Sequence, residues 1–145
     1  MDIEIYEVGP RDGLQNSSFK LSTENKVHLI KELYSAGLTQ MEIGSFVHPK
    51  YVPNMADSKE VFLQTKEIAD FDVLIPNQKG FDNAKEIGAK NFNVFFSPSK
   101  EFNMRNLNRS LEEKFSELDD MLIEVDRSNV RAYVSCAFGC PFEGK

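Results

Sequence analysis

The sequence is poor in cysteine, in histidine and in basic charge, and each shortage excludes a class of protein. Only two cysteines occur, Cys136 and Cys140, whereas a secreted disulfide scaffold carries more cysteines, spread along its chain. The two histidines, His28 and His48, do not stand at the spacing of an H-x-H or H-E-x-x-H metal site. The formal net charge of −6 argues against a nucleic-acid binder that follows the phosphate backbone with a basic stripe.

The sequence also lacks a long apolar run and a targeting segment. No stretch reaches the roughly 20 apolar residues of a membrane-spanning helix, and strand-like residues already begin at Ile3, where a signal or transit peptide would otherwise stand. The length of 145 residues and the hydrophobic fraction of 41% fit a single globular domain with a buried core. We therefore expect a cytoplasmic protein with reduced thiols that binds neither nucleic acid nor membrane.

What the sequence does contain is a regular alternation of strand and helix patterns. Short runs rich in aromatic and β-branched residues predict five strands, at Ile3–Val8, Gln40–Gly44, Phe71–Ile75, Phe92–Phe96 and Val130–Cys136. Helical spacing of apolar residues and capping residues predict four helices between them. The first helix follows the N-cap Ser22 and ends at Gly37, and the second opens with a capping box of Asp57 and Glu60. The third runs from about Gly80 to Ile87. The fourth opens with a capping box of Ser110 and Glu113, and its apolar face consists of Leu111, Phe115, Leu118, Leu122 and Val125.

Strands that alternate with helices predict an α/β protein with a parallel sheet, either doubly wound or a TIM (β/α)8 barrel. The first turn, Gly9–Gly13, is not the G-x-G-x-x-G of a dinucleotide-binding fold, which weakens the doubly wound alternative. A complete barrel needs roughly 200 or more residues, so this chain supplies about the first four to five βα units. Either the chain is a fragment of such a barrel or something else covers its open strand edges.

Unusual polar residues follow the predicted strands, where the chemistry of parallel sheets collects. Arg11 and Asp12 follow the first strand. One interpretation is a carboxylate ligand for Mg²⁺ or Mn²⁺ beside an arginine that binds a developing oxyanion; the other is a turn with a surface ion pair. Glu42 lies between Met41 and Ile43 and would need a buried partner, for which Arg11 is placed. The alternative for Glu42 is the outward face of a half-exposed strand.

The histidines and cysteines carry weaker signals. His28 lies four residues before Glu32 on the first helix, which is typical of a solvated position, and His48 lies in a loop where a substrate contact and a plain loop role are both open. Cys136 and Cys140 are spaced C-x-x-x-C and provide two of the four ligands that a structural zinc site needs. A structural role in the loop is favoured over catalysis, and a redox-sensitive pair remains an alternative.

The run from Val8 to Asn16, VGPRDGLQN, resembles the first-strand signature of the 3-hydroxy-3-methylglutaryl-CoA lyase family, which belongs to the DRE-type metal-dependent lyases. Further stretches resemble the same family in order along nearly the whole chain: Glu42 with Ser45–Val47, Pro49–Asp57, Asn77–Gly80 and Tyr133–Gly144. Related synthases share the Arg-Asp element but generally not the Gly-Leu-Gln-Asn that follows it.

The resemblance implies a TIM barrel enzyme that cleaves the carbon–carbon bond of an acyl-CoA substrate, 3-hydroxy-3-methylglutaryl-CoA, to acetyl-CoA and acetoacetate, as in leucine degradation and ketone-body metabolism. It implies that residues 1–145 are the N-terminal part of a single barrel domain, with Mg²⁺ or Mn²⁺ as cofactor and a homodimer at full length. By the same resemblance Asp12 is a metal ligand, Arg11 binds the enolate oxygen, and Glu42 is a catalytic-site residue that orients Arg11 or a ligand. Substrate contacts are expected from Arg11, Gln15, Asn16 and Ser99.

The chain departs from the family pattern in two respects. The family's two histidine ligands, an asparagine ligand and a catalytic cysteine all belong to the second half of the barrel, and Cys136 and Cys140 are not their counterparts. In addition, Lys100 separates Ser99 from Glu101, whereas many relatives place the acidic residue directly after the serine. We therefore expect the 145-residue chain alone to be inactive. The alternatives are a condensing synthase that joins an acyl-CoA to a 2-oxo acid, and a non-catalytic half-barrel that dimerises or pairs with a separate chain.

Overall fold

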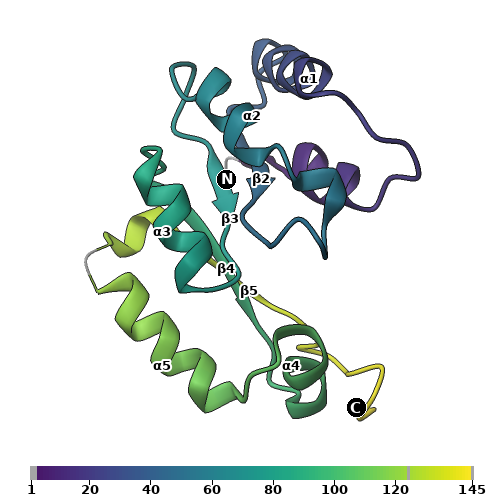
Figure 1. Cartoon of the computed structure of the whole chain (residues 1–145), viewed down its shortest axis with the longest axis vertical. Coiled ribbons are helices and arrows are strands. Elements are labelled where there is room, and N and C mark those ends of the chain that lie inside the picture. The colour runs from purple at the N-terminus through teal and green to yellow at the C-terminus, as the bar shows by residue number, and fades with distance from the viewer. Residues whose placement is uncertain (1–2, 124, 145) are drawn as a thin grey trace.

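The computed structural model describes residues 3–123 and 125–144 and contains one parallel sheet of five strands (Figure 1). The strands are β1 (Tyr6–Glu7), β2 (Gln40–Ser45), β3 (Asp72–Leu74), β4 (Asn91–Phe96) and β5 (Val130–Val134), and they lie side by side in chain order. Because right-handed crossovers between consecutive neighbours all fall on the same face, the helices cover one face of the sheet. This strand order is that of a barrel and not of a doubly wound sheet, in which the order reverses beside the first strand.

All five predicted strands are present, but the first, the third and the last are shorter than predicted. The first was predicted at Ile3–Val8, yet only Tyr6 and Glu7 pair with β2, and Ile3 and Ile5 are exposed. The last was predicted to reach Cys136. It ends at Val134 because Cys136 takes a left-handed backbone conformation, with φ of 59°, that turns the chain out of the strand.

Two of the predicted helix starts are confirmed by their caps. The hydroxyl of Ser22 accepts a hydrogen bond from the backbone N–H of Asn25 at 3.3 Å and begins α1 (Thr23–Ser35). Ser110 and Glu113 form the predicted capping box, with bonds of 2.8 and 3.1 Å, and begin α5 (Leu111–Leu122). The Phe115 side chain is 44% exposed, so it lies at the margin of the predicted apolar face, where it contacts Phe96 edge-on.

The predicted capping box of Asp57 and Glu60 is wrong. Helix α2 (Ser58–Thr65) does follow Asp57, but the carboxylate does not cap it. The carboxylate instead accepts hydrogen bonds from Thr23 at 2.7 Å and from the Lys26 ammonium, both on α1. Leaving a buried ammonium without a partner costs more free energy than leaving an exposed backbone N–H uncapped, and Lys26 is only 4% exposed. Asp57 therefore joins two helices instead of starting one.

Two further helices differ from the predictions. Helix α3 (Gln78–Glu86) begins earlier than the predicted Gly80, because the side chain of Asn77 caps it by accepting from the N–H of Gly80 at 3.0 Å. Helix α4 (Lys100–Leu107) was not predicted and lies between β4 and α5. Its start is capped by Ser99, and Asn108 ends it in the left-handed conformation. Its polar composition hid it within a predicted loop.

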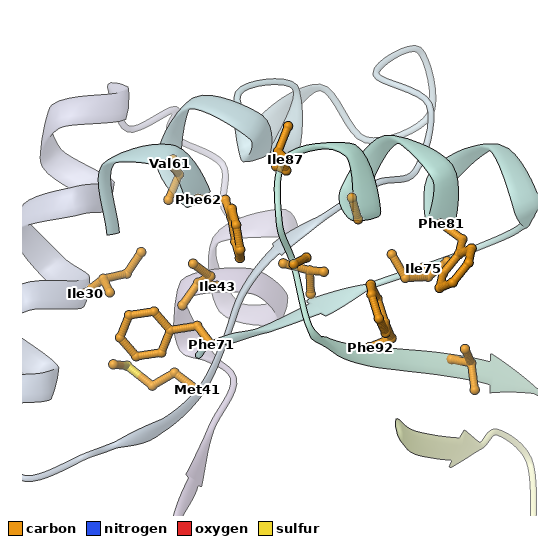
Figure 2. Close-up of a cluster of buried hydrophobic side chains, with 14 of the residues drawn as sticks. Ile30, Met41, Ile43, Val61, Phe62, Phe71, Ile75, Phe81, Ile87 and Phe92 are labelled. Carbon is orange, nitrogen blue, oxygen red and sulfur yellow. The ribbon is translucent and has the colours of Figure 1, made fainter. Parts of the chain in front are cut away.

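The apolar core fills the space between the sheet and its helices (Figure 2). Strand residues alternate between the two faces, and the residues that point to the helices are apolar: Met41, Ile43, Val73, Ile75, Phe92 and Val94. Helix side chains such as Ile30, Val61 and Phe81 close over them. Each large side chain buried in this way contributes about 1.5–3 kcal/mol. The residues between these positions, including Glu42 and Asn93, point to the opposite face of the sheet.

Within the described part of the chain, no helix combines the length and the apolar character needed to cross a membrane.

The Lys26–Asp57 pair gives a test of how α1 is held to α2. Burial raises the pKa of Asp57, but hydrogen bonds from Lys26 and Thr23 outweigh burial and lower it. Lys26→Met leaves Asp57 with the Thr23 hydroxyl but no charged partner, and should lower the free energy of unfolding at neutral pH by about 2–4 kcal/mol in urea titrations.

The matched control is Lys31→Met, an exposed lysine on the same helix, which should change stability little. Because the folded pKa of Asp57 is depressed, its stabilisation is present above the pKa of the unfolded chain and is lost as the pH falls through the folded value. The difference between the wild type and Lys26→Met should therefore shrink in acid, and a constant difference would contradict this assignment.

Candidate active site

Arg11 and Asp12 lie at the carboxyl end of β1, in a single π-helical turn formed by Gly9–Gly13. The N–H groups of both residues donate to the carbonyl of Val8, at 3.1 and 2.7 Å, and these bonds wind the chain tightly as it leaves the strand. π-Helical turns are rare in proteins, and those that occur are often found at functional sites. The turn brings the two side chains to the mouth of the curved sheet, where the Asp12 side chain is 55% exposed.

Arg11 connects two carboxylates. Its Nε–H donates to Oε1 of Glu42, and its Nη1 donates to Oδ1 of Asp12 at 2.9 Å. Glu42 is fully buried, which excludes the half-exposed alternative for this residue. The predicted partnership of Arg11 with Glu42 is thus confirmed as a contact. The Arg11 guanidinium is therefore held by the buried carboxylate of Glu42 and lies beside the exposed carboxylate of Asp12.

The second oxygen of Glu42 is also held, by two residues that the sequence analysis did not single out. Asn93 on β4 and Tyr133 on β5 both donate to Oε2, the tyrosine hydroxyl at 3.1 Å. Burial and the charge of Glu42 raise the pKa of Tyr133 to about 12, so the hydroxyl stays protonated as a donor. An asparagine between Phe92 and Val94 breaks the apolar run of β4, and period-two alternation would have marked it as facing away from the core.

A second polar layer lies toward the amino ends of the strands. The Tyr6 hydroxyl accepts from Asn93 Nδ2 at 2.6 Å and donates to Asp72 at 2.6 Å. The Arg131 guanidinium lies 3.8 Å from the centre of the Tyr6 ring and 4.0 Å from Asp72. Burial raises the pKa of Asp72, although Tyr6 and Arg131 oppose the shift. Hydrogen bonds therefore run continuously from Asp72 to Arg11 across all five strands.

The loop that carries Gln15 and Asn16 is held by one asparagine, Asn54. Its Nδ2 lies within hydrogen-bonding distance of the carbonyls of Leu14, Gln15 and Ser17, at 3.2, 3.3 and 3.0 Å. The Lys26 ammonium in turn donates to the backbone carbonyl of Asn54. Asn54 thus ties the segment after Asp12 to the turn before α2. Sequence reasoning missed Asn54, since nothing local to it marks its contacts.

The predicted substrate-contact residues fall into two groups. Gln15 and Asn16 share the loop of Asp12: Asn16 donates to the Asp12 carbonyl at 3.3 Å, and the buried Oε1 of Gln15 has no hydrogen-bond partner in the described part of the chain. Ser99 lies in the loop after β4 and is buried. Its hydroxyl accepts from the N–H of Phe102 at 3.0 Å and donates to Cys140 at 3.0 Å, so a substrate contact would have to replace one of these bonds.

The histidines lie away from Arg11. His28 is exposed and stands 3.9 Å from Glu32, in keeping with the predicted solvated position. The ring of His48 accepts from the N–H of Lys50 at 3.1 Å and lines two cavities of about 460 and 600 Å³. The larger cavity also contains Arg105, Arg109 and Lys114. These cavities lie at the same end of the sheet as Arg11.

The residues of the site fit a divalent metal ion only as part of its ligand set. Among residues 3–123 and 125–144, no group of three or more histidine, cysteine, aspartate and glutamate side chains is placed to hold a metal. Asp12 offers one exposed carboxylate, a hard oxygen ligand of the kind that Mg²⁺ prefers, but Mg²⁺ requires near-octahedral coordination. Asp12 would therefore be one ligand of a set completed by water, substrate oxygens or other protein groups.

The support of Glu42 by Tyr133 is testable in the chain itself. Tyr133→Phe removes one of the donors to Oε2 and should destabilise the fold by about 1–2 kcal/mol in urea, since the carboxylate is fully buried. Tyr51→Phe is the matched control, because that side chain is 76% exposed and should change stability by less than about 0.5 kcal/mol. Equal effects of the two substitutions would contradict the assignment.

The Asn54 contacts predict how firmly the Asp12 loop is closed. Asn54→Ala removes the amide that contacts three carbonyls and should raise the rate of trypsin cleavage after Lys20, an exposed residue of this loop, by about tenfold. Asn83→Ala, at an exposed position on α3, should leave the rate unchanged. Faster cleavage in both variants, or in neither, would show that Asn54 does not hold the loop.

Comparison with known proteins agrees with this architecture. The HMGL-like family model matches residues 2–145. Mitochondrial hydroxymethylglutaryl-CoA lyases of Macaca fascicularis and Homo sapiens are 48% and 47% identical over 147 residues, which cover 99% of this chain and 45% of each relative. A 3-hydroxy-3-isohexenylglutaryl-CoA/hydroxy-methylglutaryl-CoA lyase of Pseudomonas aeruginosa is 42% identical, over 98% of this chain and 49% of its own length.

Solved structures show the same relation. The HMG-CoA lyase of Bacillus subtilis superposes with a TM-score of 0.90 at 39% identity, over 99% of this chain and 49% of that chain. An HMG-CoA lyase of Acinetobacter baumannii, in complex with coenzyme A and 3-methylmalate, gives 0.89 at 35% identity, over 98% and 48%. The chain thus spans about half the length of these relatives, and its curled sheet corresponds to the N-terminal part of a TIM barrel. By its matching family model, this chain belongs to the HMGL-like family.

Proposed function

We propose that residues 1–145 form the N-terminal part of the catalytic barrel of a hydroxymethylglutaryl-CoA lyase. The complete enzyme would cleave 3-hydroxy-3-methylglutaryl-CoA to acetyl-CoA and acetoacetate. The observation that carries the proposal is Arg11, fixed by the buried Glu42 and set beside the exposed Asp12 at the mouth of the sheet. The relatives' names support an acyl-CoA substrate, as does the coenzyme A bound in the Acinetobacter baumannii structure.

In this proposal the chain supplies positive charge where negative charge develops. Breaking the C2–C3 bond leaves an enolate on the acetyl-CoA unit, and Arg11 would donate hydrogen bonds to its oxygen. Arg11 needs no reorganisation to do so, because Glu42 already fixes the guanidinium through Nε. Asp12 would be the one metal ligand from this chain, and a bound Mg²⁺ or Mn²⁺ would polarise the oxygens of the leaving acetoacetate unit.

The surrounding residues would shape the entrance. Gln15 and Asn16 lie on the loop beside Asp12, and Gln15 would have to turn its buried, unpaired Oε1 outward to accept a hydrogen bond from substrate. Arg109 lines the larger cavity and offers a guanidinium suited to the phosphates of an acyl-CoA, whereas Arg105 and Lys114 beside it are paired with Glu101 and Glu117. We keep Ser99 in the proposal as a residue whose loop contacts the substrate, because its hydroxyl is already hydrogen-bonded to Cys140.

The biological setting is part of the proposal. We infer a homodimer at full length and a role in leucine degradation or ketone-body metabolism. Mitochondrial and bacterial relatives both match the chain, so the cytoplasmic location stays a prediction.

The activity test compares this chain with a protein that also contains the rest of the barrel. The longer protein should release acetoacetate from 3-hydroxy-3-methylglutaryl-CoA in the presence of Mg²⁺ or Mn²⁺, whereas the 145-residue chain should not, because in this proposal the remaining metal ligands belong to the rest of the barrel. Acetoacetate release by the 145-residue chain above a metal-free control would contradict the division of the site, and an inactive longer protein would contradict the function.

In the longer protein, Arg11→Met should lower kcat by about 10²–10³ with a smaller change in KM, because the lost interaction is made chiefly in the transition state. Arg127→Met, at an exposed position far along the chain, is the control and should leave both constants unchanged.

A further inference from the structure

The loop after β5 brings the two cysteines of the chain together. Cys136 and Cys140 both line a surface cavity of about 400 Å³, with Ser99 and Gly139 among the other lining residues. The loop is closed by a pair of backbone hydrogen bonds between Cys140 and Gly144, at 2.7 and 2.9 Å. Cys136 lies just before this closed loop, so the two cysteines, four residues apart, border the same cavity.

The surroundings of Cys140 favour a thiolate. The Ser99 hydroxyl donates to its Sγ at 3.0 Å, and the backbone N–H of Phe142 donates at 3.4 Å. Burial raises the pKa of the Cys140 thiol, but the donors from Ser99, from the backbone of Phe142 and Glu143, and from Cys136 together lower it. Donors directed at sulfur are the feature that separates reactive cysteines from inert buried ones.

Cys136 has the opposite character. Partial burial raises the pKa of its thiol, and the contact with Cys140 raises it further, while Ser97 opposes the shift. It is more exposed than Cys140, and its backbone is held in the left-handed conformation, with φ of 59°. This strain is uncommon for a residue other than glycine and fixes the direction of the side chain. The two cysteines that border this cavity therefore differ: hydrogen-bond donors lower the pKa of Cys140, and partial burial raises the pKa of Cys136.

We propose that Cys136 and Cys140 form a thiol–disulfide exchange site whose substrate class is a small-molecule disulfide. The Cys140 thiolate attacks one sulfur of the disulfide, forms a mixed disulfide and releases one thiolate. Cys136 then loses its proton to solvent and attacks Sγ of Cys140, which forms the Cys136–Cys140 disulfide and releases the second thiolate. The two protein thiols are oxidised, and the external disulfide is reduced to two thiols.

This site does not depend on the proposed lyase activity, because no residue of the Arg11–Glu42 network takes part. It nevertheless lies at the end of β5, the same end of the sheet as Arg11, and the Ser99 hydroxyl connects it to the start of α4. Oxidation would therefore fix the loop that faces the mouth of the sheet and release the hydrogen bond of Ser99.

The chain offers a clean experiment, since it contains no other cysteine. The reduced, folded 145-residue chain is treated with oxidised glutathione, quenched with acid and followed by intact-mass spectrometry. We expect the loss of two hydrogen atoms without a glutathione adduct, reversed by dithiothreitol. Cys136→Ser should instead accumulate one glutathione adduct on Cys140, and Cys140→Ser should react at least about threefold more slowly than Cys136→Ser.

Substitutions of Ser99 test whether its hydroxyl is responsible for the reactivity of Cys140. Ser99→Ala removes the hydroxyl that donates to Cys140 and should slow the adduct formation measured in the Cys136→Ser background by about threefold or more. Ser99→Thr keeps a hydroxyl and should restore the rate, while Ser116→Ala, at an exposed position, should not change it. Circular dichroism establishes that each variant is folded before its rate is compared.

Three results would overturn the proposal: stable adducts on both cysteines of the wild type, an unreactive folded chain whose cysteines react only in guanidinium, or equal rates for Cys136→Ser and Cys140→Ser. The first would show that the thiols cannot meet, the second that they are packing residues, and the third that Cys140 is not the attacking group.

Discussion

The contact between the buried carboxylate of Glu42 and the guanidinium of Arg11 is the constraint on which the rest of the site depends. An ionised carboxylate without a partner in the interior would cost several kcal/mol. Here Oε1 is bonded by Arg11 and Oε2 by Asn93 and Tyr133, so strands β2, β4 and β5 and the turn after β1 meet at a single side chain. This arrangement fixes the Arg11 guanidinium, a cation, at the mouth of the sheet.

The two faces of the sheet have different roles. The face under the helices is apolar and supplies most of the stability through burial. The opposite face carries a hydrogen-bonded polar side chain from each of the five strands, from Asp72 and Tyr6 at one end to Glu42, Asn93 and Tyr133 next to Arg11 at the other. The Asn54 amide and the Lys26–Asp57 pair connect the apolar half to the loop beside Asp12, so helix packing also positions the site.

The strands and most of the helices follow from the sequence because their signals are local, whereas the barrel order of the strands was implied by the family resemblance. Ser22, Ser110 and Glu113 cap their helices as their spacing indicates, and alternation in β2 isolates Glu42 between two core residues. The partnership of Arg11 with Glu42 could be predicted, since a buried charge needs an opposite one. Asp57 could not be placed in the same way, because a distant buried lysine competed with the local cap and prevailed. Asn93, Tyr133 and Asn54 were missed for a related reason: their partners lie 37 to 91 residues away in the chain, and no local pattern encodes such contacts.

The central claim is that Arg11 and Glu42 form one energetic unit, and a double-mutant cycle measures this most directly. Arg11→Met, Glu42→Gln and the double variant are unfolded in urea, and the coupling energy is taken from the four free energies of unfolding. The account predicts a coupling of about 2–4 kcal/mol, because each single substitution leaves a buried polar group without its partner. Additive effects, with a coupling below about 0.5 kcal/mol, would show that the two side chains act independently and would contradict it.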